Sequence, residues 1–215
     1  MLKQLLFSAS LLLPLAGANP AREEADSEPR IYGEWELDRN SGGVKTYTRW
    51  ITMDRSHKVR ERRGEMALNC TVNDAVKLLC DTKITGSWMS GIKENYCLKQ
   101  ISQSEWFTYT LFDIPWPFEE RDLISNYQVK NLDEGNGVVI LINSREDYLP
   151  EKQNIQRLTN YTANWTIVRM GDARVSISFS AIADTPPMFP RFIQDPVLAQ
   201  LFHNNLVNLK KMLDS

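Results

Sequence analysis

The sequence predicts an α+β domain in which one curved antiparallel β-sheet wraps around a long C-terminal helix. Three observations lead to this prediction. Several segments carry β-branched and aromatic residues between turn signals, and two late segments alternate apolar and polar residues with period two. The stretch from about Pro190 to Leu213 carries leucines at helical spacing. The apolar face of such a sheet, here called the dry face, must be shielded from water, and amphipathic helices can cover it.

The N-terminus predicts a secretory signal peptide over residues 1–18. Lys3 precedes an apolar run from Leu5 to Leu15, and small residues follow at a suitable cleavage site. The run is too short for a stable membrane anchor. We therefore expect an exported protein, periplasmic or secreted, with a flexible lead over 19–30 and a single domain over 31–213. A buried N-terminal helix or strand is the alternative.

Composition and cysteine count narrow the functional classes. The chain is 42% hydrophobic and 24% charged, with a formal net charge of -2, which argues against a nucleic-acid partner. Cys70, Cys80 and Cys97 lack metal-binding spacing, so we expect neither a metal nor another cofactor. One disulfide with one free thiol, or no disulfide at all, both remain open.

The strands follow in order along the chain. A strand over 44–51 comes after the turn residues 40–43 and pairs with one over 58–69. The clearest hairpin joins 160–168 to 174–182 through Met170-Gly171-Asp172, and its apolar alternation places one set of side chains on the dry face. The remaining predicted strands are 94–102, 104–114, 122–129 and 137–144. The dry-face residues of the hairpin are Tyr161, Ala163, Trp165, Ile167, Val175, Ile177, Phe179 and Ala181.

Two helices are predicted to cover this face. The first follows Thr71, a plausible N-cap, and runs over 72–81. In the second, Pro196 is expected to kink the helix or delay its start, with Asp195 as an N-cap, and His203 is expected on the polar side. The apolar stripe of this second helix is Leu198, Leu201, Phe202, Leu209 and Leu213.

The segment PWPFEERD, residues 115–122, resembles the Pro-Trp-Pro-x-x-x-Arg-Asp element of START-like lipid-binding domains, the steroidogenic acute regulatory protein-related lipid transfer family. Arg63-Gly64-Glu65 before the first helix, Asp81 and Trp88 after it, and Arg157 before the penultimate strand follow in the family's order. The resemblance spans roughly 31–213 and suggests a bacterial exported member.

This resemblance implies a helix-grip fold with an internal apolar tunnel between the sheet and the C-terminal helix. In some sterol-carrying relatives an arginine lies in the tunnel at the place of Tyr127, so a different polar ligand group is implied. Trp116 could instead shield a sheet end, and Arg121 could instead pair with Glu65. The residues predicted to line the cavity are Trp88, Tyr109, Trp116, Arg121, Tyr127, Arg157, Trp165, Phe179, Leu198 and Phe202.

The expected function is binding of a hydrophobic ligand, a sterol or phospholipid-like lipid, by a monomer that contacts membranes transiently, and transfer of that ligand is left open. His57 and His203 show no partnership with a nucleophile, so we expect a binding protein. The alternative is a cyclase-like or hydrolase-like enzyme of the wider superfamily that acts on an apolar substrate in the same cavity.

Overall fold

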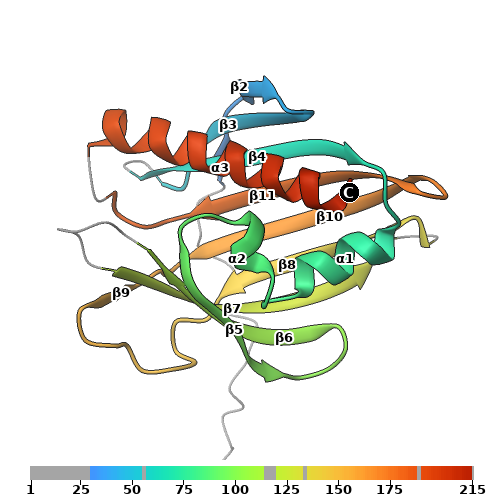
Figure 1. Cartoon of the computed structure of the whole chain (residues 1–215). Coiled ribbons are helices and arrows are strands. Elements are labelled where there is room, and N and C mark those ends of the chain that lie inside the picture. The colour runs from blue at the N-terminus through green and yellow to red at the C-terminus, as the bar shows by residue number, and fades with distance from the viewer. Residues whose placement is uncertain (1–29, 55–56, 114–119, 133–134, 188–189, 215) are drawn as a thin grey trace, which may run out of the picture.

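The computed structural model describes residues 30–54, 57–113, 120–132, 135–187 and 190–214. Within these ranges, eleven strands form one open sheet, and three helices lie over one of its faces (Figure 1). The predicted fold class is confirmed. The predicted signal peptide, nearly all of the lead, and Trp116 lie outside the described residues.

The sheet is antiparallel except where β9 pairs with β7. The strand order is β1-β3-β4-β11-β10-β8-β7-β6-β5, and β2 pairs with β3. The strands are β1 (Ile31–Tyr32), β2 (Glu36–Ser41), β3 (Val44–Thr52), β4 (Lys58–Leu68), β5 (Ile92–Gln100), β6 (Glu105–Phe112), β7 (Glu120–Asn131), β8 (Gly137–Ser144), β9 (Ile155–Arg157), β10 (Tyr161–Gly171) and β11 (Arg174–Ala183).

The β10–β11 hairpin has the predicted register. Trp165 lies opposite Phe179, and Ile167 lies opposite Ile177. Strand β4 then pairs with β11, which places Gly64 opposite Phe179. Early and late parts of the chain therefore meet in the middle of the sheet.

The first helix, α1 (Val72–Cys80), begins as predicted. Thr71 Oγ1 accepts a hydrogen bond from the Asp74 amide at 3.2 Å, and the Thr71 amide donates to Asp74 Oδ2 at 3.3 Å. This reciprocal capping box satisfies two amides at the helix start. A second short helix, α2 (Thr85–Trp88), follows α1 and was not predicted.

The C-terminal helix, α3 (Arg191–Leu213), covers the predicted stretch. It contains Pro196, so the expected delay of its start is wrong, and Pro190 stands at its N-cap instead of Asp195. The Asp195 carboxylate lies 3.2 Å from Arg60 Nε and 3.7 Å from Arg62 Nη2. The carboxylate therefore links the first turns of α3 to β4.

Apolar clusters occupy both faces of the sheet. The face covered by the helices, here called the inner face, carries Trp165 and Phe179 in the larger cluster. The opposite, outer face carries a smaller cluster around Tyr109 and Ile124. No helix in the described ranges is long and apolar enough to cross a membrane.

Candidate functional site

Four of the predicted lining residues meet between the inner face and the helices. The rings of Trp165 and Phe179 stack with centroids 4.1 Å apart, and Phe202 of α3 lies 5.8 Å from Phe179. Trp88 of α2 meets Trp165 edge-on at 6.2 Å. Offset and edge-on contacts are the favourable geometries for aromatic rings. Strands β10 and β11 and helices α2 and α3 thus build one aromatic wall.

Glycine at position 64 lets α3 approach this wall. A Cβ atom on Gly64 would overlap Leu206 Cδ1 and would lie 3.5 Å from Phe202 Cε1. Leu206 is buried, so its side chain has little room to move away. The glycine in the segment 63–65 therefore has a packing role in seating α3 on the sheet.

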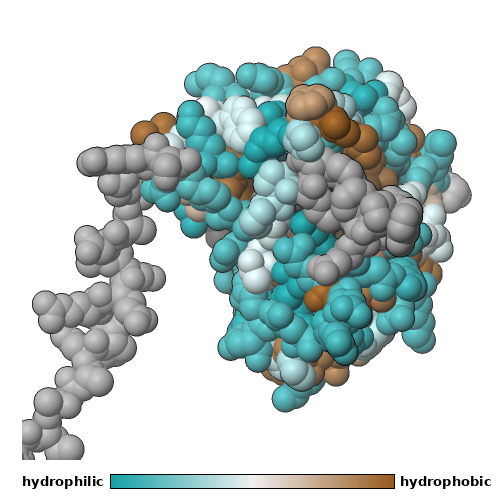
Figure 2. Space-filling view, turned by 90° about the vertical axis from the view of Figure 1, so that its left-hand side faces the viewer, coloured by the Kyte–Doolittle hydropathy of each residue, from teal (hydrophilic) through white to brown (hydrophobic). Residues whose placement is uncertain are grey.

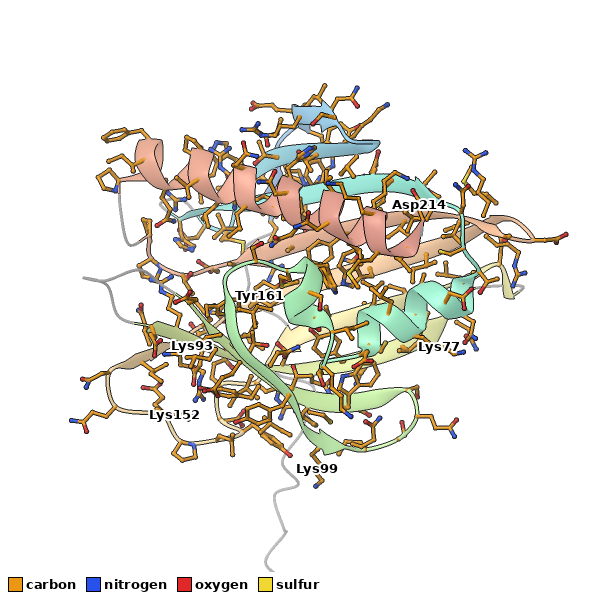
Figure 3. The ribbon with its side chains drawn as sticks, viewed as in Figure 1. Lys77, Lys93, Lys99, Lys152, Tyr161 and Asp214 are labelled. Atoms are coloured by element: carbon orange, nitrogen blue, oxygen red, sulfur yellow. The ribbon has the colours of Figure 1, made fainter. Side chains whose placement is uncertain are left out.

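Two tyrosines, Tyr127 and Tyr161, pack beside the aromatic wall. Burial raises the pKa of Tyr127 to about 12 and also raises the pKa of Tyr161. Both side chains are nevertheless only half-buried, and Tyr161 lies among the side chains within the molecule (Figure 3). Both side chains therefore pack against the inner-face cluster with part of their surface uncovered. Trp106 stacks on Tyr127 with ring centroids 5.3 Å apart and supports it.

The aromatic wall also carries an unused hydrogen-bond donor. Trp88 is 3% exposed, and among the described residues its Nε1 has no hydrogen-bond partner. An unsatisfied buried donor costs about 1–3 kcal/mol. A ligand oxygen placed at this atom would remove that cost.

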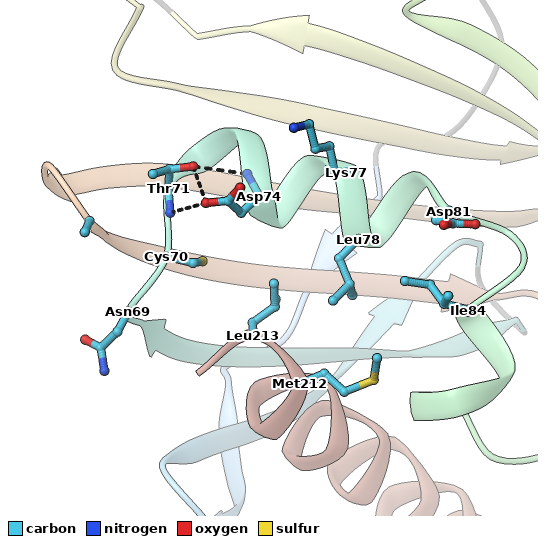
Figure 4. A pocket seen from close by; sticks show the side chains of 11 residues that line it. Asn69, Cys70, Thr71, Asp74, Lys77, Leu78, Asp81, Ile84, Met212 and Leu213 are labelled. Atoms are coloured by element: carbon cyan, nitrogen blue, oxygen red, sulfur yellow. Dashed lines mark hydrogen bonds between the residues drawn. The ribbon is translucent and has the colours of Figure 1, made fainter. Parts of the chain in front are cut away.

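Helix α1 has a pocket on each side. The larger, about 560 Å³, lies between α1 and the C-terminal turn of α3 (Figure 4). Its apolar part includes Leu78 and Leu213, while Asp74 and Lys77 give it a charged part. The smaller, about 150 Å³, lies between the end of α1 and strands β5 and β6. Cavities on both flanks leave α1 less supported than α3.

Tyr109 and Arg157 do not line the inner space, which corrects the prediction. Tyr109 lies opposite Ile124 on the outer face. Arg157 forms a buried ion pair with Asp122, with Nε 2.5 Å from Oδ1 and Nη2 3.0 Å from Oδ2. Its Nη1 also donates to the Leu149 carbonyl oxygen at 3.0 Å. These residues fasten the 145–158 segment to the outer face.

Two further predicted residues have other surroundings than expected. Arg121 lies on the same side of β7 as Tyr127, and its Nη2 donates to the Pro186 carbonyl oxygen at 3.4 Å. The suggested partner, Glu65, pairs with Arg63 at 2.6 Å. Leu198 is 37% exposed, so it does not belong to the buried stripe of α3.

Sequence reasoning missed three residues. Tyr161 was placed on the dry face but not in the site, although it shares the parity of Trp165. Trp106 was given no role. His203 was expected on the polar side, yet it is 3% exposed and bonds Ser41 Oγ through Nε2 at 2.9 Å. Its spacing of three residues from Leu206 could have placed it on the buried stripe.

The described residues include no group of three or more acidic, histidine or cysteine side chains that could hold a metal ion.

No family model matches the sequence. The chain is 22% identical over 177 residues to the uncharacterized protein PA1579 of Pseudomonas aeruginosa, covering 82% of this chain and 85% of that protein.

The fold has counterparts among solved structures. A STAR-related lipid transfer protein fragment from Xanthomonas axonopodis matches 84% of this chain and 99% of its own, with a TM-score of 0.73 and 25% identity. Human StAR-related lipid transfer protein 5 matches 83% of this chain and 86% of its own, with a TM-score of 0.68 and 16% identity. The Zhui aromatase/cyclase from Streptomyces sp. R1128 matches 72% of this chain and 92% of its own, with a TM-score of 0.51 and 13% identity. The chain therefore has the START-like helix-grip fold.

Proposed function

We propose that this protein is an exported carrier that binds one hydrophobic ligand, a lipid, between the inner face and α3. The observation that carries the proposal is the aromatic wall between the inner face and the helices, with the half-buried Tyr127 and Tyr161 packed against the same cluster. An empty apolar cavity costs about 24 cal/mol per Å³. A lipid in that space would gain contacts and remove its own apolar surface from water, at about 25 cal/mol per Å². The lipid transfer proteins that share the fold support this choice.

The polar groups beside the aromatic wall favour a ligand with an uncharged oxygen. Among the described residues the Trp88 indole N–H has no hydrogen-bond partner, and the hydroxyls of Tyr127 and Tyr161 are neutral at physiological pH because burial raises pKa values that already lie well above it. Neutral donors suit a hydroxyl, carbonyl or ester oxygen. A sterol or an ester-linked lipid fits this chemistry.

The start of α3 supports contact with a lipid surface. Phe192 is 79% exposed, Val197 63% and Ile193 48%. Apolar residues gather along the upper part of the molecular end where α3 begins (Figure 2). Arg191 is exposed beside them, and Asp195 is already paired with two arginines of β4, so the net charge here is positive. We propose that this patch meets an anionic bilayer during ligand exchange.

Native mass spectrometry of protein purified from its own host tests the carrier function. We expect one copy of a lipid per chain, released by solvent extraction and replaced when the protein is incubated with lipid vesicles. A ligand-free species that takes up no lipid would contradict the proposal.

Conservative variants distinguish the site from its surroundings. Tyr127→Phe and Tyr161→Phe each remove one inner hydroxyl and should weaken ligand binding by about threefold to tenfold if that hydroxyl bonds the ligand. Tyr109→Phe is the matched control on the outer face and should leave binding unchanged. Turnover of the bound molecule that disappears in Tyr127→Phe would favour the enzyme alternative instead.

A further inference from the structure

We propose that Cys80 and Cys97 form a disulfide bond under oxidising conditions. All three cysteines are free thiols in the structure. Cys80 is the last residue of α1, and Cys97 lies in the middle of the edge strand β5. Both line the same pocket of about 150 Å³, together with Trp106. Two thiols on facing elements across one small pocket are a candidate redox pair.

Contacts outside the pocket place the two cysteines together independently. Cys97 lies opposite Thr108 of β6, and Thr108 bonds the hydroxyl of Tyr127. Cys80 is near enough to Tyr127 to contribute to its raised pKa. Each thiol is therefore a neighbour of the same Thr108–Tyr127 pair.

A hydrogen bond joins the two segments close to the thiols. The side-chain amide of Asn95, two residues before Cys97, donates to the carbonyl oxygen of Thr82, two residues after Cys80, at 3.3 Å. Because β5 is the last strand of the sheet, it has only one neighbouring strand to resist a small inward movement. A disulfide requires Cα atoms within about 7 Å, so the bond requires α1 and β5 to approach this closely across the pocket.

Cys70 is not the partner of either residue. It is buried just before α1, at the opposite end of the helix, and it lines the larger pocket. The burial of Cys70 also raises the pKa of its thiol. The pairing therefore leaves Cys70 as the single free thiol.

The chemistry balances with a small-molecule disulfide, such as oxidised glutathione, as the oxidant. The exposed Cys97 thiolate attacks one glutathione sulfur and releases one glutathione thiol. Cys80 then loses its proton, attacks Cys97 Sγ and displaces the second glutathione thiol. Two electrons pass from the two protein thiols to the oxidant, which leaves as two thiols.

Burial makes the second step slow. It raises the pKa of the Cys80 thiol to about 12, so little thiolate is present near neutral pH. In the range well below this pKa, the rate of closure should rise about tenfold per pH unit when Cys80 attack limits it.

The bond would tie the end of α1 to β5 through a loop of about 17 residues. In the chain-entropy model, closing a loop of this size should raise the melting temperature by about 5–10 °C. It would also fix one flank of α1 beside the Trp106–Tyr127 stack, at the border of the inner space.

The test is peptide mapping of the full chain after incubation with oxidised glutathione. We expect a loss of about 2 Da in the intact protein and a non-reduced peptide that links Cys80 to Cys97. The Cys70→Ser control should form the same link, whereas Cys80→Ser should stop at a glutathione adduct on Cys97. A stable adduct on wild-type Cys97, an unmodified protein, or a link that involves Cys70 would overturn the proposal. No ligand enters this measurement, so its outcome is separate from that of the carrier function.

Discussion

Gly64 of β4 and Leu206 of α3 lie so close that a Cβ atom on the glycine would overlap the leucine side chain. Gly64→Ala should therefore lower the free energy of unfolding by about 1–3 kcal/mol, because the buried Leu206 must leave its place. Urea denaturation followed by tryptophan fluorescence measures this change.

Gly86 is the matched control for this substitution. A Cβ atom there meets nothing within 4 Å, and the residue lies in α2. Gly86→Ala should leave stability unchanged or raise it by up to about 1 kcal/mol. Equal losses in both variants would show that α3 does not depend on the close approach at Gly64.

Removal of one partner of the Asp122–Arg157 pair should strongly destabilise the protein. Asp122→Asn leaves a buried guanidinium without its countercharge, so we expect a loss of about 3–5 kcal/mol. Asp147→Asn, in the exposed pair with Arg145, should change stability by less than about 1 kcal/mol. Ligand binding per folded molecule should be unchanged in both variants. Loss of binding in folded Asp122→Asn would contradict the placement of Arg157 outside the inner space.

Acidification should destabilise the protein through His203. Burial, with a smaller effect from Arg39, lowers the pKa of His203 below its ordinary value of 6.5, while Asp38 acts in the opposite direction. The unfolded chain then binds more protons than the folded one as the pH falls below about 6.5. This contribution to stability is fully present above about pH 6.5. It is lost as the pH falls from there to the pKa of His203 in the folded protein.

His203→Gln should remove that part of the pH dependence. Denaturation midpoints measured between pH 7 and pH 5 should fall more steeply in the wild type than in the variant. Equal slopes would mean that His203 keeps the same affinity for protons in both states.

The apolar start of α3 should govern binding to anionic vesicles. The double variant Phe192→Ser, Val197→Ser should bind vesicles of phosphatidylcholine and phosphatidylglycerol about tenfold more weakly, because both side chains are largely exposed. Met170→Ser, at the distant β10–β11 hairpin, is the control for loss of an exposed apolar side chain. Cosedimentation measures both, and a similar decrease in the control would exclude a specific docking patch.

The sequence predicted the parts of the fold that have a clear periodicity. The alternation in β10 placed Trp165 on the inner face, and the capping residues of α1 set its start at Val72. Elements as short as α2 and β9 contain too few residues to show a period, so they were not predicted.

The site was less predictable because the alternation of apolar and polar residues does not show which way a side chain points when both faces of the strand are buried. Strand β6 is buried along nearly its whole length, so its alternating apolar and polar residues do not separate a covered face from an exposed one, and they did not indicate that Tyr109 faces outward. The role of Arg157 depends on Asp122, which lies 35 positions earlier and is brought near only by the β7–β9 pairing. Such a partner has no local signature in the sequence.

The pairing of β4 with β11 has a consequence for biogenesis. Strand β4 ends at Leu68, yet its neighbour begins at Arg174, so the first hairpin lacks its partner until most of the chain has been made. Helix α3, which lies against β3 and β4, is synthesised later still. Contacts of such long sequence separation delay folding. The chain should therefore remain unfolded during most of its synthesis, which is the state in which an exported polypeptide can be threaded through a translocation channel.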